Sequence, residues 1–280
     1  VGGMGVSAFH PHAASAAGDM AGKNRAAGLA AFMAIGTVGY ALGPLFSAYL
    51  MSAPHIGPSR MPYASFIGII ATILLYKFVS LKKIHDSEKK SESIFQIIKP
   101  KIRLIFFLFM IVTLRSTTTI VFVNFLSLLI KQRQLSLMIG AIVLFIFSLS
   151  TAVGTFLGGY ICKWVSRRSL LMYSMSLSSP LLIWMLYSNG TLFVILLILS
   201  GIVSSCSNPV NLAIAQEAIP KGASTASSLM MGASWGVAAI IAMFFGMIAD
   251  RFGGNVVPAM AISAVLPIVA SFFAIPLPKR

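Results

Sequence analysis

The sequence predicts an all-α integral membrane protein, and its composition and charge pattern lead to this prediction. Of the 280 residues only 10% are charged and 58% are hydrophobic, and the mean hydropathy is +0.91, whereas about a quarter of the residues of a soluble domain are charged. The net charge of +15 comes from short basic clusters between long apolar runs. Such clusters indicate membrane topology rather than a nucleic-acid-binding surface.

Nine segments are long and apolar enough for a transmembrane helix, which needs about 20 residues. They lie near residues 1–19, 26–51, 62–80, 104–130, 137–161, 169–187, 191–215, 224–248 and 256–276. The polar connections between them are short, apart from a lysine-rich stretch at 81–103. We therefore expect nine helices that cross the membrane in alternating directions.

Basic residues are distributed unequally over the two sides that these spans define. Sixteen of the 21 fall on one side, four fall on the other, and Arg115 lies within a span. The richer side contains Lys23, Arg25, the eight basic residues from Lys77 to Arg103, Lys163, Arg167, Arg168, Lys221, Lys279 and Arg280. The positive-inside rule makes this side, and the C-terminus with it, cytoplasmic. We expect a multi-pass protein of the cell membrane.

An internal repeat with an ungapped offset of 198 residues relates the first helices to later ones. A repeat in the same direction predicts two helix bundles related by an axis along the membrane normal. Residues 1–80 would be helices four to six of a first six-helix bundle, 81–103 a cytoplasmic linker, and 104–280 a second six-helix bundle. About three helices are expected before Val1. The offset pairs His10 with Asn208, Pro11 with Pro209, Asp19 with Glu217 and Lys23 with Lys221.

The stretch SAFHPHAASAAGD, residues 7–19, places polar groups inside the first apolar segment. Pro11 removes one backbone hydrogen bond and lets the helix bend, so a polar cavity can receive His10. Ionisable groups inside a membrane mark function by default, and histidine titrates near physiological pH. His10, and less so His12 on a different face, is a candidate for proton or substrate transfer. The alternative is a neutral His10 that donates to a carbonyl group freed by the proline.

Asp19 follows His10 by nine residues, about 13 Å along a helix, and therefore reaches the cytoplasmic end. An acid and a base four residues apart can pair locally there. Alternatively, these charges form a gate at which the two halves meet when the cytoplasmic side is closed. The predicted gate residues are Asp19, Lys23, Arg25, Arg167, Arg168, Gln216, Glu217 and Lys221.

Arg115, in the stretch TLRSTTT, lies about 17 Å into its span, too deep for its guanidinium to reach the membrane surface comfortably. A guanidinium there needs an acidic partner, carbonyl groups, water or an anionic ligand. We expect contact with an anionic substrate in a pathway that also contains Asn124 and Asn208. The alternative is a carboxylate in helices that precede Val1.

Glycine and proline residues predict close helix packing and kinks. They are Gly39, Gly43 and Pro44 in the stretch GTVGYALGP, together with Pro11 and Pro209.

Cys162 and Cys206 are expected to pack as small residues, because their positions at spans far apart in sequence do not form a disulfide framework or a metal site. The sequence contains no nucleophile-and-base pair, no metal-ligand cluster and no phosphate-binding loop. We therefore expect no enzyme, no metal and no cofactor.

Several of these motifs resemble those of the major facilitator transporters. Gly39, Gly43 and Pro44 resemble the antiporter signature of the fifth helix in that superfamily. Residues 158–168, GGYICKWVSRR, resemble a degraded copy of its loop between helices eight and nine. Because Lys163 occupies the usual acidic position of this loop, its usual charge relay is in doubt here.

The segments around His10–Pro11, Gly43–Pro44 and the set Gln216, Glu217 and Pro220 are similar to the fosmidomycin-resistance branch of the superfamily. This resemblance implies a twelve-helix fold with alternating access and proton-driven export of a small anionic or amphipathic molecule. The alternatives are uptake of a metabolite such as a sugar or an organic acid, and a signalling or scaffold protein that does not transport. The expected partners are the substrate, protons and the lipid bilayer, without nucleic acid, and the expected state is a monomer.

Overall fold

The computed structural model describes residues 2–52, 62, 65–78 and 98–278, and these residues form helices without a β-strand. The predicted all-α class is therefore confirmed. Most of the predicted linker, 81–103, lies outside the described residues, which resume at 98.

The helices follow the predicted apolar segments in order. They are α1 (Gly2–Met20), α2 (Arg25–Ser52), α3 (Ser65–Phe78), α5 (Ile102–Gln132), α6 (Leu137–Ile161), α7 (Arg167–Tyr187), α8 (Gly190–Ser205), α9 (Asn208–Ala218), α10 (Ala223–Ser227), α11 (Ser234–Arg251), α12 (Val256–Ser263) and α13 (Leu266–Ala274). Short 3-10 turns are η1 (Gly22–Asn24), η3 (Lys99–Lys101) and η4 (Pro220–Gly222), and η5 (Ser228–Ala233) is a π-helical turn between α10 and α11.

Within the described ranges, seven helices are long and apolar enough to cross a membrane. They match seven of the nine predicted spans, and three of them are built from consecutive short helices: α8 with α9, α10 with α11, and α12 with α13. The other two predicted spans are α1, which has 19 residues but is rich in alanine, glycine and polar groups, and α3, which has 14 residues.

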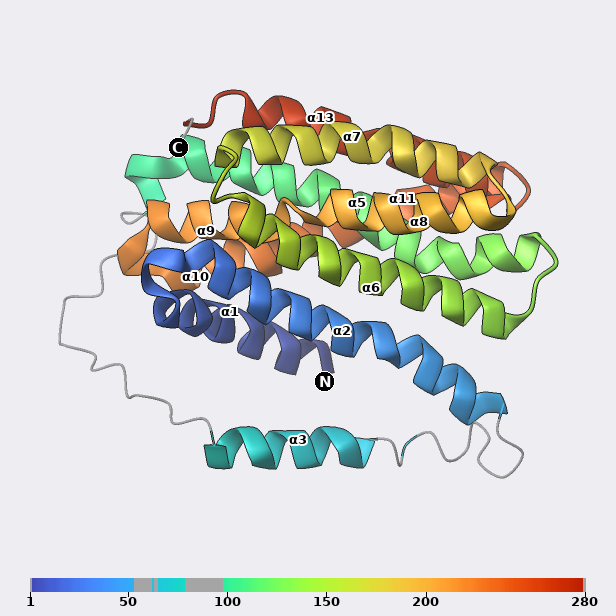
Figure 1. Cartoon of the computed structure of the whole chain (residues 1–280), viewed down its shortest axis with the longest axis horizontal. Coiled ribbons are helices and arrows are strands. Elements are labelled where there is room, and N and C mark those ends of the chain that lie inside the picture. The colour runs from blue at the N-terminus through green and yellow to red at the C-terminus, as the bar shows by residue number, and fades with distance from the viewer. Residues whose placement is uncertain (1, 53–61, 63–64, 79–97, 279–280) are drawn as a thin grey trace.

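Successive spans run in opposite directions, so the predicted basic side becomes one end of the molecule. We call it the basic end; it carries Lys23, Arg25, Lys99, Lys101, Arg167 and the end of α13. It lies on the left in Figure 1, with the C-terminus. The opposite end carries Arg133, Asn189 and Arg251.

Helices α5 to α13 form one bundle, in which α5 packs against α6, α11, α12 and α13, and α7 packs against α8 and α13. The helices α1 and α2 lie along one side of this bundle (Figure 1). There α2 contacts α6 and α9, and α1 contacts α10 and η5. In the same view α3 lies apart from the other helices, consistent with its exposed side chains.

Two hydrophobic clusters divide the core along the helices. Near the basic end, Ala14 of α1 and Leu29 of α2 are buried in one cluster with residues of α5, α7, α9 and α13. The buried members of the other cluster all lie between Val121 and Ala264. Near the basic end both helices therefore share a buried core with the bundle, and farther along α2 Ala41 and Ala48 are also buried, beside α6.

Three glycines of α6 allow its neighbours to approach closely. A β-carbon on Gly154 or Gly158 would collide with the backbone of the α8 span, and one on Gly159 would collide with Ala30 of α2. Small residues at such positions let membrane helices pack backbone to backbone.

The close packing predicted for Gly39 and Gly43 is not present among the described residues, because no atom lies within 4 Å of either β-carbon position. The helix α2 also continues through Pro44 to Ser52. Small residues three or four apart occur in both α2 and α6, and only the three-dimensional arrangement decides which set meets a neighbouring helix.

Candidate functional site

The span formed by α8 and α9 is broken close to α2 and α6. The break follows Ser205, and α9 begins at Asn208 with Pro209 as its second residue, as the sequence predicted for a kink. Proline has no N–H group to donate to the carbonyl group of Ser205. Non-helical backbone at membrane depth is tolerated where protein or a water-filled cavity surrounds it. The equivalent proline of the repeat, Pro11, is buried in α1, which continues through it.

Three carboxamide side chains of α9 enter the protein interior. Asn208 is half-buried, whereas Asn211 and Gln216 are 1% and 0% exposed. The side-chain oxygen of each has no hydrogen-bond partner among the described residues. Since buried polar groups normally have partners, three free acceptors on one short helix make α9 the leading candidate for contact with a polar ligand or with water.

The amide nitrogens of Asn208 and Asn211 fix α9 to the helices beside it. Asn208 Nδ2 donates to Thr155 Oγ1 of α6 at 3.4 Å, and Asn211 Nδ2 donates to the carbonyl oxygen of Leu108 of α5 at 3.4 Å. Sequence reasoning identified Asn208 through the repeat but missed Asn211. The signal that could have found it is a carboxamide within a largely apolar membrane span.

Gln216 joins α9 to both α1 and α10. Its Nε2 donates to Ser227 Oγ of α10 at 2.9 Å and to the carbonyl oxygen of Ala14 of α1 at 3.4 Å. On the same side, Gln216 Oε1 lies 2.5 Å from the position that a β-carbon on Gly18 would occupy. The side chain therefore lies between residues that the repeat assigns to two different bundles.

The charged residues predicted for the gate form two ion pairs, one on each side of the Gln216 contact. Neither pair crosses that contact. Arg25 of α2 binds Asp19 of α1, and its Nε also donates to the carbonyl oxygen of Gly18 at 3.3 Å. Arg167, at the start of α7, donates to Glu217 Oε2 of α9 at 2.5 Å. Each acid thus pairs with an arginine of a neighbouring helix, and Asp19 pairs with Arg25 instead of Lys23. The side chain of Lys221, the other predicted partner, lies outside the described part of the chain.

The Arg167–Glu217 pair also connects the loop at 158–168, which contains Arg167, to α9. Lys163 stands where an acid would usually supply a charge relay, and its Nζ lies 4.6 Å from the centre of the Tyr160 ring. An ion pair to α9 nevertheless forms, from Arg167. Of the other predicted gate residues, Lys23 is exposed and Arg168 is half-buried.

His10 lies exposed on α1, and so does His12. The ring of His10 is edge-on to Phe32 of α2, with 6.4 Å between ring centres. Within the described chain no hydrogen bond reaches this ring, so the alternative in which His10 donates to a carbonyl group freed by Pro11 is not seen. His10 remains open to a proton or a ligand.

Arg115 lies inside the second bundle. It is 7% exposed and thirteen residues, about 20 Å, from the start of α5. Within residues 2–52, 65–78 and 98–278 its guanidinium forms no ion pair, and its Nε has no hydrogen-bond partner. It borders a cavity of about 10 Å3, which is at the lower limit for one water molecule. The other lining residues are Thr118, Thr119, Phe122, Phe147, Leu182, Ser204 and Pro267.

The structure does not bring Arg115 and Asn124 together. Nine residues separate them on α5, which places them about 180° apart around the helix, and Asn124 is exposed. Neither α1 nor α2 contributes to the lining of the Arg115 cavity. These two residues therefore lie away from the contact between α1 and α9.

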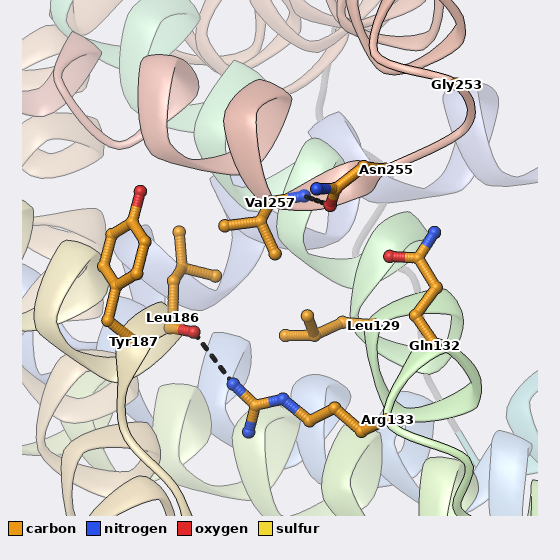
Figure 2. A pocket seen from close by; sticks show the side chains of 8 residues that line it. All are labelled: Leu129, Gln132, Arg133, Leu186, Tyr187, Gly253, Asn255 and Val257. Atoms are coloured by element: carbon orange, nitrogen blue, oxygen red, sulfur yellow. Dashed lines mark hydrogen bonds between the residues drawn. The ribbon is translucent and has the colours of Figure 1, made fainter.

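A larger cleft, of about 560 Å3, opens at the opposite end of the bundle. Figure 2 shows its lining, which comes from the ends of α5 and α7, from the turn after α11 and from the start of α12. Sequence reasoning missed this cleft because its residues come from three separate segments, 129–133, 186–187 and 253–257. The lining residues are Leu129, Gln132, Arg133, Leu186, Tyr187, Gly253, Asn255 and Val257.

The helices, the broken span and the paired charges can be compared with known proteins. The model of the Major Facilitator Superfamily matches residues 1–242. The chain belongs to the Major Facilitator Superfamily. Members of this superfamily are multi-pass membrane transporters, not enzymes, and the sequence-based resemblance to it is confirmed. No group of three or more metal-ligating side chains occurs among the residues described.

Relatives within the superfamily are distant. The chain is 26% identical over 276 residues to an uncharacterized MFS-type transporter, YfnC, of Bacillus subtilis, and 23% identical over 273 residues to the fosmidomycin resistance protein of Escherichia coli. Each match covers 95% of this chain and 66% of the relative. A crystal structure of the Escherichia coli fucose:proton symporter FucP has a TM-score of 0.69 at 16% identity, covering 96% of this chain and 72% of that one. That likeness shows the fold.

Proposed function

We propose that the chain is the greater part of a secondary active transporter that exports a small anionic or amphipathic molecule in exchange for protons. The observation that carries this proposal is the contact of α1 with α9 and α10 through Gln216 at the basic end. Because Gln216 is fully buried and Ala14 and Leu29 lie in the hydrophobic cluster beside it, we take this contact as the closure of one end. Alternating access requires such a contact to open and close.

The internal repeat supports a division into a first bundle, 1–80, and a second bundle, 104–280, joined by 81–103. Under the offset, α1 corresponds to α9, and α2 corresponds to the α10–α11 span. The contacts of α1 with α10 and of α2 with α9 are then equivalent to each other. Paired contacts of this kind are expected where two similar bundles meet about an axis along the membrane normal.

His10 and Asn208 are our candidates for the pathway. His10 precedes Ala14, which accepts from Gln216, by four residues, about 6 Å along the same face of α1. Asn208 precedes Gln216 on α9 and keeps a free side-chain oxygen. We infer that His10 carries the proton, because its exposed ring has no hydrogen-bond partner among the described residues and histidine is a common proton-transfer group, and that Asn208 contacts the cargo.

The basic end is cytoplasmic in this proposal, by the excess of basic residues there. The pairs Asp19–Arg25 and Arg167–Glu217 then flank Gln216 at the cytoplasmic mouth. A closed cytoplasmic mouth is the state in which an exporter releases its cargo outside. The nature of the cargo rests on the 23% identity to the fosmidomycin resistance protein.

The test is transport by the full-length gene product in right-side-out and inverted membrane vesicles under an imposed pH gradient, with fosmidomycin as the probe. Proton-coupled export predicts uptake of the probe into inverted vesicles that are acidic inside, and its loss when the gradient collapses. His10→Gln should abolish the pH dependence, whereas His12→Gln, the neighbouring control, should keep it. Accumulation only in right-side-out vesicles would indicate proton-coupled uptake, and no movement in either would indicate a role without transport.

A further inference from the structure

The cleft at the opposite end of the second bundle has the size and the walls of a small-molecule site. Its volume of about 560 Å3 falls in the range of roughly 300–1,000 Å3 that is usual for ligand pockets. Leu129 and Leu186 border it but are only 2% and 3% exposed. The surface that a ligand can contact therefore comes from Tyr187, Val257 and the polar lining residues (Figure 2).

Among the described residues, Arg133 is the one charged residue in the lining of this cleft. Its Nη2 donates to the carbonyl oxygen of Leu186 at 2.8 Å, and its guanidinium carbon lies 4.7 Å from the centre of the Phe193 ring. These two contacts hold the guanidinium in place at the end of α7, and Figure 2 shows the hydrogen bond to Leu186. A guanidinium carries five N–H groups, so most of its donors remain available to a ligand.

The turn between α11 and α12 is held in position over the same cleft. Gln132 Nε2 donates to the carbonyl oxygen of Gly254 at 2.7 Å, and Gln132 Oε1 accepts from the N–H of Val256 at 3.4 Å. Asn255 Oδ1 caps α12 by accepting from the N–H of Val257 at 3.0 Å, which leaves the amide group of Asn255 free to donate. The positive end of the α12 dipole lies at this turn.

The electrostatic balance of the cleft favours an anion. In the described part of the chain its lining contains donors on Arg133, Asn255 and Tyr187 and no carboxylate. Burial lowers the pKa of Arg133 below its ordinary value, because partial removal from water disfavours the charged form. A bound anion would offset that cost.

We propose that this cleft binds a small molecule by its anionic group, a phosphonate, phosphate or carboxylate, which Arg133 and Asn255 recognise beside Tyr187 and Val257. All of the lining belongs to residues 129–257, so the site is separate from the contact of α1 with α9 and does not depend on the export proposal. The same chemistry fits a free solute and the headgroup of an anionic phospholipid.

The test is calorimetric titration of the purified full-length protein, in a neutral detergent, with phenylphosphonate as the probe and benzyl alcohol as the uncharged comparison. Wild-type protein should bind phenylphosphonate saturably and benzyl alcohol much more weakly. Arg133→Gln should weaken binding of phenylphosphonate at least tenfold, since it removes a charge-assisted two-point contact. Lys131→Gln, which removes an exposed charge two residues away and outside the lining, should change it less than twofold.

A second variant keeps the proposal testable if loss of Arg133 disturbs folding. Asn255→Asp preserves the helix cap, because aspartate caps as well as asparagine, but places a carboxylate beside the anion. It should weaken phenylphosphonate binding at least tenfold without lowering the unfolding temperature. Absence of saturable binding by the wild type, or binding by both variants as tight as that of the wild type, would overturn the proposal.

The same titration in lipid nanodiscs shows whether the natural occupant is a phospholipid headgroup or a free solute. If the occupant is a phospholipid, discs that contain phosphatidylglycerol should weaken the apparent affinity for phenylphosphonate relative to discs of phosphatidylcholine alone. If it is a free solute, the two affinities should agree. Either result, with the expected effects of Arg133→Gln and Asn255→Asp, supports the site.

Discussion

Gln216 lies so close to Gly18 that a β-carbon added to Gly18 would stand 2.5 Å from Gln216 Oε1. The contact joins α9 to α1 at the basic end, and Gln216 is fully buried there. The carboxamide can be buried here because its nitrogen donates to Ser227 Oγ and to the carbonyl oxygen of Ala14. Its oxygen has no donor among the described residues. A buried acceptor without a partner costs about 1–3 kcal/mol, so the contact is closed but easily exchanged for water.

Gly18→Ala should destabilise this contact. The added methyl group would displace the Gln216 carboxamide, and overpacking of this kind costs about 1–3 kcal/mol. The unfolding temperature of the purified protein should fall, and transport should change with it. Gly36→Ala is the matched control on α2, because nothing lies within 4 Å of its β-carbon position.

The Gly18 effect should disappear when Gln216 is shortened. In a Gln216→Ala background, Gly18→Ala should have almost no further effect on the unfolding temperature, because the colliding oxygen is gone. An equal loss in both backgrounds would show that Gly18 is constrained by something other than Gln216.

The Arg167–Glu217 pair should contribute little to stability. The two side chains are 26% and 43% exposed, and pairs of this exposure contribute about 0–1 kcal/mol. Arg167→Gln and Glu217→Gln should therefore leave the unfolding temperature nearly unchanged and slow transport if the pair helps to close the mouth. The charge-swapped double variant, Arg167→Glu with Glu217→Arg, should recover transport, whereas a defect equal to the sum of the single defects would mean that the pair has no role in closing.

The predicted orientation can be tested with the native Cys162, which lies just beyond α6 at the basic end. An impermeant maleimide should label it only after permeabilisation, whereas Asn189→Cys at the opposite end should react in intact cells. Burial raises the pKa of the Cys162 thiol, although nearby Arg167 opposes the shift. Less of the thiol is then ionised at neutral pH. The labelling rate of Cys162 should therefore keep rising to a higher pH than the labelling rate of Asn189→Cys.

Labelling of Cys162 in intact cells, together with protection of Asn189→Cys, would place the basic end outside. Cys206 is 7% exposed within the α8–α9 break, so it should contribute little to labelling. The variant Cys206→Ala checks this directly.

The sequence predicted the positions of the spans well, because length and apolarity alone decide where a chain can cross a bilayer. It also predicted the break before Pro209, since proline removes a specific backbone donor. It did not predict which face of a helix meets which neighbour. Gly39 and Gly43 form as good a small-residue pattern as Gly154 and Gly158, yet only the α6 pair meets another backbone in the described chain.

The same reason explains the errors within the candidate site. In a soluble helix a polar stripe marks the solvent side, but a membrane helix is apolar all round and its rotation is not encoded in that way. Arg115 and Asn124 were therefore assigned to one pathway because they follow each other along one span, although they lie on opposite faces of α5. Asn211 and the Arg133 cleft depend on contacts between distant segments, which no local pattern contains.

The last prediction concerns Arg115, a buried charge without a counterion among the described residues. The described carboxylates, Asp19, Glu217 and Asp250, are each the second-last residue of a helix, whereas Arg115 lies near the middle of α5. A charge at the centre of a membrane helix costs about 2.5–3.5 kcal/mol on insertion scales. Arg115→Met keeps the length of the side chain and removes the charge, so it should raise the unfolding temperature.

Transport assays distinguish a role of Arg115 within the second bundle from its contact with an anionic cargo. If Arg115 acts only within the second bundle, Arg115→Met and Arg115→Gln should alter transport of an anionic and a neutral compound to the same extent, normalised to protein level. A selective loss for the anionic compound would place Arg115 in contact with cargo after all. A fall in the unfolding temperature of Arg115→Met would instead reveal an acidic partner outside the described residues, because removing one member of a buried ion pair leaves the other uncompensated, at a cost of about 3–5 kcal/mol.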